Sequence, residues 1–180
     1  MGEKKELHAR LFALFTELMN QLPDLIEQFL RGQRIAVVGV SRKGDVAANA
    51  VLKKLMRCGY DAIPVNPNAD MLEGVQCYPE ISAIPDTVDG VVIATHPDVS
   101  ARIVRQCAES GVDKIWFHRS FGQGSVSDEA LAECKRLGLV PIVGGCPLMF
   151  CDPVDPFHRI ARWWLQKRGT VPSCRSEQSE

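Results

Sequence analysis

The chain has 180 residues, of which 46% are hydrophobic and 24% charged, and its formal net charge is −1. This length suits one domain with a substantial core, and the composition is ordinary for a globular protein. A charge near zero argues against a general nucleic-acid binder, which needs a basic surface. No apolar run reaches the roughly 18–20 residues of a membrane span, and no signal-peptide cleavage site follows the N-terminal segment. We therefore expect a cytoplasmic protein with no membrane or nucleic-acid partner, in which the seven cysteines are reduced.

Residues 1–32 are expected to form an N-terminal helical arm. Six large apolar residues recur there at helical spacing and make one stripe: Leu7, Leu11, Leu14, Phe15, Leu18 and Leu22. Pro23 interrupts the pattern, and 24–30 reads as a second short helix that ends at Gly32. Such a stripe packs either on its own domain or on a second copy, so a homodimer is one expected state.

Residues 33–169 alternate between β-rich apolar runs and amphipathic helical segments. The strands are expected at 34–40, 61–65, 90–95, 113–118 and 139–143, with a short edge strand at 75–78. The helices are expected at 46–57, 98–110, 127–137 and 156–167. Continuous apolar strands between helices predict a parallel sheet covered on both faces. The expected fold is therefore α/β, a doubly wound, mostly parallel, Rossmann-like sheet of about five to six strands.

The last expected helix begins with Asp155 as its N-cap and Pro156 in its first turn. Four apolar residues fall on one side of it: Phe157, Ile160, Ala161 and Trp164. Because Trp163 and Trp164 cannot both face that side, one of them is a candidate for an interface. Residues 170–180 are polar and are predicted to be a disordered tail.

The loop after the first strand is the first candidate site, at Gly39, Val40, Ser41, Arg42 and Lys43. A glycine at a strand end permits a sharp turn and close ligand approach. The N-terminus of the next helix points its N–H groups into the same space, which suits a phosphate. The serine hydroxyl and the two cations add hydrogen bonds and charge. An ordinary glycine turn with solvated charges is the alternative.

Two familiar nucleotide-binding motifs fail on these residues. The spacing of Gly39 and Gly44 matches a Walker A loop, but Asp45 and Val46 stand where that motif needs Lys and Ser or Thr. A GxGxxG fingerprint is also missing. The second strand ends at Asn66-Pro67, where a dinucleotide site prefers an acid for the ribose hydroxyls. A neutral asparagine instead tolerates a phosphate on the adenosine ribose.

A second candidate loop should face the first across the sheet. In a doubly wound sheet the chain order reverses beside the first strand, and ligands bind in that crevice. The strand at 90–95 ends in Thr95, His96 and Pro97, which we expect opposite 39–43. Thr95 is equally suited to capping the next helix, and His96 to lying in solvent.

The motifs G-V-S-R-K, P-V-N-P-N, G-V-Q-C-Y-P-E-I, V-D-G-V-V-I-A-T and a late C-P occur in this order between 33 and 147. Together they resemble the small bacterial CoA-binding domain proteins, stand-alone relatives of the CoA-binding Rossmann domain in the α subunit of succinyl-CoA synthetase. The resemblance implies coenzyme A or an acyl-CoA as ligand. It also implies contacts at 39–43 from the first loop, at Asn66 and Pro67 near the adenosine ribose, and at Thr95, His96 and Pro97 along the pyrophosphate or pantetheine. Val40 departs from the family, which usually has alanine there.

Catalysis has weak support in the sequence. Cys146 follows the last strand and His118 ends its expected neighbour, so the two could form a nucleophile pair, or Cys146-Pro147 could be a structural turn. Metal-ligand spacings and acid/base dyads are missing, so we predict no catalytic and no metal-binding residue. The expected function is non-catalytic CoA binding, as a sensor or accessory of acyl-CoA metabolism. The alternatives are an NAD(P)-binding oxidoreductase or redox sensor, and an interaction protein with a vestigial pocket.

Overall fold

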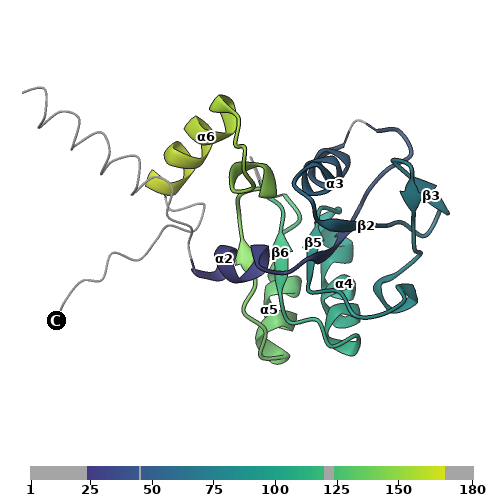
Figure 1. The fold of residues 1–180 in the computed structure, drawn as a ribbon. Coiled ribbons are helices and arrows are strands. Elements are labelled where there is room, and N and C mark those ends of the chain that lie inside the picture. The colour runs from purple at the N-terminus through teal and green to yellow at the C-terminus, as the bar shows by residue number, and fades with distance from the viewer. Residues whose placement is uncertain (1–23, 45, 120–123, 169–180) are drawn as a thin grey trace, which may run out of the picture.

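A computed structural model of the chain describes residues 24–44, 46–119 and 124–168. The predicted helix over 7–22 and the predicted tail at 170–180 lie outside this part. Five strands form a parallel sheet in the order β2-β1-β5-β6-β7 (Figure 1). They are β1 (Arg34–Val38), β2 (Asp61–Val65), β5 (Gly90–Ile93), β6 (Ile115–Phe117) and β7 (Ile142–Val143). The predicted doubly wound α/β fold is confirmed.

The chain order reverses at β1. Val38, the last residue of this strand, pairs with Val65 of β2 on one side and with Ile93 of β5 on the other. The three strands therefore end level with one another, and the segments that follow them leave the same edge of the sheet. Ligands bind at this edge in open α/β sheets.

Helices cover both faces of the sheet because side chains alternate along each strand. Ile35 and Val37 pack with α2 (Asp24–Leu30), α3 (Ala47–Arg57) and α6 (Pro156–Lys167). Ala36 and Val38 point to the other face, where α4 (Pro97–Glu109) and α5 (Asp128–Arg136) pack. Two 3-10 turns, η1 (Ile81–Ala83) and η2 (Pro147–Met149), complete the fold. Two hydrophobic cores result, one on each face of the sheet.

The strand at 34–40 was predicted too long, and the segment at 75–78 pairs differently from an edge strand. β1 ends at Val38 because Gly39 has a φ of +103°, which leaves the extended region. β4 (Val75–Gln76) pairs antiparallel with β3 (Met71–Leu72) in a separate two-stranded sheet. A bridge between Tyr78 and Val65 connects this segment to the main sheet.

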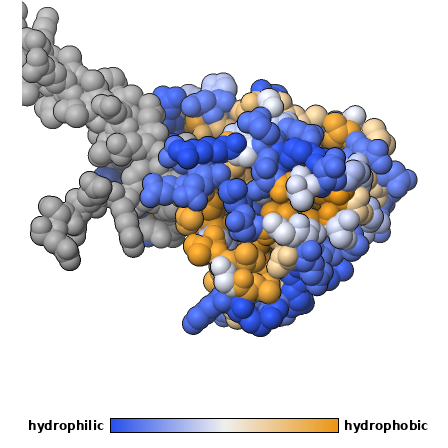
Figure 2. Space-filling view, turned by 60° about the horizontal axis from the view of Figure 1, so that its bottom comes forward, coloured by the Kyte–Doolittle hydropathy of each residue, from blue (hydrophilic) through white to orange (hydrophobic). Residues whose placement is uncertain are grey.

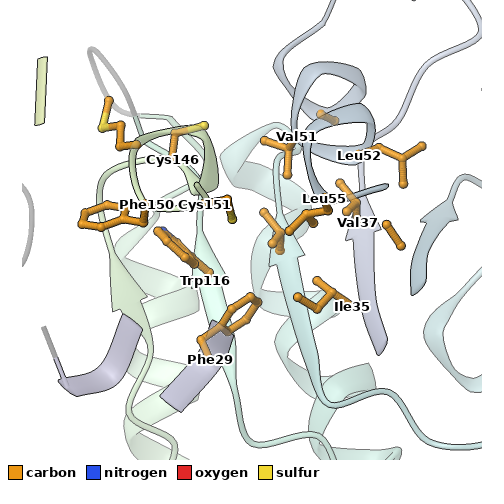
Figure 3. Packing of buried hydrophobic residues seen from close by; sticks show 14 of the residues in the cluster. Phe29, Ile35, Val37, Val51, Leu52, Leu55, Trp116, Cys146, Phe150 and Cys151 are labelled. Atoms are coloured by element: carbon orange, nitrogen blue, oxygen red, sulfur yellow. The ribbon is translucent and has the colours of Figure 1, made fainter. Parts of the chain in front are cut away.

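An aromatic stack forms the centre of the core under α2. Trp116 of β6 is fully buried, and its side chain lies between Phe29 of α2 and Phe150 after η2 (Figure 3). The ring centroids of Phe29 and Trp116 are 5.3 Å apart in an edge-to-face arrangement, and those of Trp116 and Phe150 are 5.7 Å apart. Gly90 makes room for this stack, since a Cβ there would lie 2.7 Å from the Phe29 ring.

Among the described residues, no helix has the length and apolar content to cross a membrane. The face turned forward in Figure 2 is largely hydrophilic, with hydrophobic residues gathered in patches between the polar ones. The exposed large apolar residues of the described part include three on one helix, α6: Phe157, Ile160 and Trp164.

Candidate functional site

A cleft of about 380 Å³ opens at the edge of the sheet where β2, β1 and β5 end. The segments after these strands supply Gly39, Asn66 with Pro67, and Thr95. The opposite wall comes from Pro79 and Glu80 and from residues of α4 that include Arg102 and Gln106. The cleft thus lies at the point where the chain order reverses, as the sequence predicted for a ligand site.

Gly39 sets the shape of this cleft. A Cβ at this position would lie 2.8 Å from the carbonyl carbon of Ala94 and 3.1 Å from Cγ2 of Thr95. The Gly39 N–H also donates to the carbonyl of Val65, with 3.3 Å between N and O. The turn after β1 is therefore pressed against the ends of both neighbouring strands. Its positive φ and this close approach both require glycine.

Asn66 ties the end of β2 to the turn after β1. Its Nδ2 donates to the carbonyl oxygen of Val40 over 2.6 Å, and its Oδ1 accepts from the N–H of Asn68 over 2.8 Å. The side chain is thus engaged at both ends and braces the floor of the cleft. A carboxylate here would lose the bond to Val40, because it has no donor when ionised.

Asn49 of α3 holds the loop at 40–44 from behind. It is only 1% exposed, and its Oδ1 accepts from the N–H of Ser41 over 2.9 Å. Its Nδ2 donates to the carbonyl of Ser41 over 2.8 Å and to Oε1 of Glu73 over 2.7 Å. Lys53 pairs with the same carboxylate over 3.0 Å. The hydrogen bond from Asn49, supported by Lys53, lowers the pKa of Glu73 below its ordinary value.

Ser41 closes the loop on itself. Its Oγ accepts from the N–H of Lys43 over 3.1 Å, and its carbonyl accepts from the N–H of Gly44 over 3.3 Å. Arg42 and Lys43 have exposed side chains on this turn. The helix that follows begins after Val46, whose side chain makes no capping hydrogen bond. Valine has no side-chain oxygen that could accept a hydrogen bond from the first N–H groups of the helix, so any cap must come from another group.

At the β5–α4 corner, Thr95 does not take the first of its two possible roles, that of helix cap. His96 is the N-cap residue, and its Nδ1 accepts from the N–H of Asp98 over a long 3.5 Å. Thr95 lines the cleft, and its Oγ1 lies 3.4 Å from Oγ of the buried Ser100. Pro97 begins α4 as its first residue.

Four of the ten predicted site residues line the cleft: Gly39, Asn66, Pro67 and Thr95. Val40 is fully buried in the core, and His96 is exposed at the helix cap. The loop residues 41–43 follow Gly39 after one intervening residue and do not line the cleft themselves.

The wall formed by α4 was not predicted from the sequence. Arg102, an exposed residue of the helix, is the cation that lines the cleft. Glu80 contributes to the same wall, where its Oε1 accepts from Ser82 Oγ over 2.7 Å and its Oε2 accepts from Gln106 Nε2 of α4 over 3.3 Å. Positions 99, 102, 103 and 106 of the helix share its face toward the cleft, a spacing of three and four that could have indicated this wall.

Cys146 does not have the properties of a nucleophile. It is 3% exposed, and burial raises the pKa of its thiol to about 12. A thiol that stays protonated at neutral pH reacts poorly. Burial also lowers the pKa of His118. Within the described part of the chain, no group of three or more His, Cys, Asp or Glu residues could hold a metal ion.

A family model described as "CoA binding domain" matches residues 33–152, two thirds of the chain. The chain belongs to the CoA binding domain family. This match confirms the resemblance that the sequence motifs indicated between 33 and 147. The family's segment contains the whole sheet, both loops of the switch point and the Cys146-Pro147 turn.

Relatives of this CoA-binding domain fall into two kinds. YneT of Bacillus subtilis is 29% identical over 123 residues, which cover 68% of this chain and 88% of YneT. The ADP-forming acetate–CoA ligase II of Archaeoglobus fulgidus is 34% identical over 93 residues, but these cover 51% of this chain and only 14% of the ligase. The chain therefore corresponds to a small part of that enzyme and to most of YneT.

A solved structure shares the fold. A hypothetical protein from Pyrococcus horikoshii OT3 is 30% identical, with a TM-score of 0.62, over 70% of this chain and 91% of that protein. The matched region therefore makes up most of that protein's chain.

Proposed function

We propose that this chain binds coenzyme A or an acyl-CoA without catalysing a reaction on it, as a sensor or accessory of acyl-CoA metabolism. The observation that carries the proposal is the cleft at the switch point of a CoA-binding domain. Its floor is Gly39, which must be glycine for the turn to fit between two strand ends. CoA carries two separated groups of negative charge, a pyrophosphate and a ribose 3′-phosphate, and two cationic regions flank this floor.

The loop at 39–44 is the proposed pyrophosphate site. Asn49 fixes its backbone through two hydrogen bonds to Ser41, so the loop is ordered before a ligand arrives. α3 starts directly behind it, and the positive end of a helix dipole favours an anion. Arg42 and Lys43 supply cations at the same turn. Preorganisation of this kind reduces the entropy lost on binding.

Arg102 is the proposed partner of the ribose 3′-phosphate. It lines the same cleft as Asn66 and Pro67, the residues that the family resemblance assigns to the adenosine end. The end of β2 carries the neutral Asn66 where a dinucleotide site uses an acid, so no carboxylate from that strand repels a phosphate there. A guanidinium can bind a phosphate through two parallel hydrogen bonds.

The proposal also includes a reducing compartment such as the cytoplasm. All six cysteines of the described part are free thiols, and most of them are buried. Free thiols persist where glutathione and thioredoxin keep them reduced.

Isothermal titration calorimetry with CoA, dephospho-CoA, NAD and NADP tests the function. We expect CoA to bind and dephospho-CoA, which lacks the 3′-phosphate, to bind more weakly. Arg102→Ala should weaken CoA binding by roughly 1.5–3 kcal/mol, the contribution of hydrogen bonds to charged groups, and should leave dephospho-CoA binding nearly unchanged.

Arg105→Ala is the matched control. It removes the same charge from the same helix, but Arg105 contacts Glu133 at 3.6 Å and does not line the cleft. Its CoA affinity should equal that of the wild type. Binding of NAD or NADP in preference to CoA would favour the oxidoreductase alternative and refute the proposal.

A further inference from the structure

The surface of α6 carries more apolar area than the body of the protein covers. Ala161 and Leu165 are buried against the core, at 9% and 5% exposure. Phe157 and Ile160 are each 67% exposed, and Trp164 is 40% exposed. On a helical wheel, at about 100° per residue, these five positions form one continuous apolar arc of about 140°. The body covers one half of the arc, and the other half faces outward.

An exposed apolar strip of this kind, beside an existing contact, is a surface on which another helix can pack. Phe157, Ile160 and Trp164 are spaced by three and four residues, the spacing at which side chains of paired helices interdigitate. A helix whose apolar residues have the same spacing would therefore complement this strip.

The chain itself contains a matching segment. Leu7, Leu11, Leu14 and Leu18 are spaced by four, three and four residues. On the helical wheel all six apolar residues of this arm stripe fall within about 100°. As a helix, the 12 residues 7–18 would be about 18 Å long, the same as the 12 residues of α6.

The arm segment precedes α2 in the chain, and α2 shares a hydrophobic core with α6. This helix begins at Asp24, and three contacts connect it to α6 through the core. Phe29 contacts Trp116, Trp116 contacts Phe150, and the guanidinium carbon of Arg162 on α6 lies 4.9 Å from the centre of the Phe150 ring. Figure 3 shows the first two of these contacts, and Figure 1 shows α2 and α6 on the same side of the molecule.

We propose that residues 7–18 of the same chain dock as a helix on the Phe157–Ile160–Trp164 strip of α6. A second copy of the chain is the competing occupant. A stable dimer interface uses about 20–30 residues from each partner, whereas this strip offers three. A segment tethered a few residues away needs far less contact, since its effective concentration is in the millimolar range.

Photo-crosslinking tests the docking in the full-length protein. p-Benzoylphenylalanine is placed at position 157, in place of Phe157, and equal amounts of isotopically light and heavy protein are mixed before irradiation. We expect crosslinks to peptides from residues 7–18, with light joined to light and heavy joined to heavy. The same probe at position 159, on the opposite side of α6, should give none of them.

Arm variants supply the matched comparison. Leu14→Glu and Leu18→Glu place a charge in the stripe and should reduce the crosslink yield at least about tenfold, because they remove a buried apolar contact. Thr16→Glu adds the same charge on the opposite side of the arm and should leave the yield unchanged. Far-UV circular dichroism and the thermal midpoint should show that all three variants remain folded.

Crosslinks between light and heavy chains would overturn the proposal in favour of a second copy. So would an absence of crosslinks to the arm, or equal yields for Leu18→Glu and Thr16→Glu. None of these outcomes bears on CoA binding, because the strip on α6 shares no residue with the cleft.

Discussion

Gly39→Ala tests how closely the turn after β1 approaches its neighbours. The methyl group would meet the Ala94 carbonyl carbon at 2.8 Å, so the backbone of one strand end must move. The overpacking should cost about 1–3 kcal/mol. The φ of +103° adds roughly 1–2 kcal/mol for any residue with a Cβ. We therefore expect the free energy of unfolding to fall by about 2–5 kcal/mol in total.

Gly59→Ala is the control for the backbone term. Gly59 has a φ of +88°, but nothing lies within 4 Å of the position of its Cβ. Only the cost of the positive φ applies, about 1–2 kcal/mol. Both variants change the entropy of the unfolded chain in the same way, so that effect cancels in the comparison.

Urea denaturation measures the difference between the two variants. If the slope is about 2 kcal/mol per molar, the extra 1–3 kcal/mol lowers the midpoint of Gly39→Ala by roughly 0.5–1.5 M relative to Gly59→Ala. Coincident midpoints would refute the close approach as the reason for this glycine. A full loss of CoA binding in folded Gly39→Ala, with normal binding in Gly59→Ala, is also expected.

Three further changes probe the supports of the site and the core. Asn49→Ala removes a buried amide that bonds Ser41 twice and should cost about 2–3 kcal/mol in urea denaturation, with weaker CoA binding by calorimetry. Glu73→Gln should lower the free energy of unfolding at neutral pH. Because the pKa of Glu73 is lowered in the folded state, this loss of stability should vanish as the pH falls through that pKa. A loss of stability that stays the same from pH 7 to pH 3 would contradict the ionic role. Phe29→Ala should cost about 3–5 kcal/mol and shift Trp116 fluorescence, and an unchanged spectrum would show that the ring contact is not maintained in solution.

The order of elements could be predicted from the sequence because local patterns determine it. The β-branched run before Gly39 and the amphipathic segments after it indicated strands and helices with ends within a few residues of those observed. Two features were outside the reach of such patterns. A short strand was predicted at 75–78, but β3 and its antiparallel pairing with β4 were not, because two residues in each strand are too few for a periodicity. The cap of α4 depended on whether Thr95 or His96 reached the Asp98 N–H, which only the geometry of the corner decides.

The location of the cleft followed from chain order, but the identity of the residues that line and support it did not. Alternating strands and helices imply a reversal beside β1, and that reversal puts Gly39, Asn66 and Thr95 at one edge. The sequence by itself could not show that Asn49 fixes the loop. It also could not show that Arg102, far along the chain from the loop cations, is the cation in the cleft. Contacts between distant segments arise only when helices pack on the sheet, and the angle of that packing is not encoded in any local pattern.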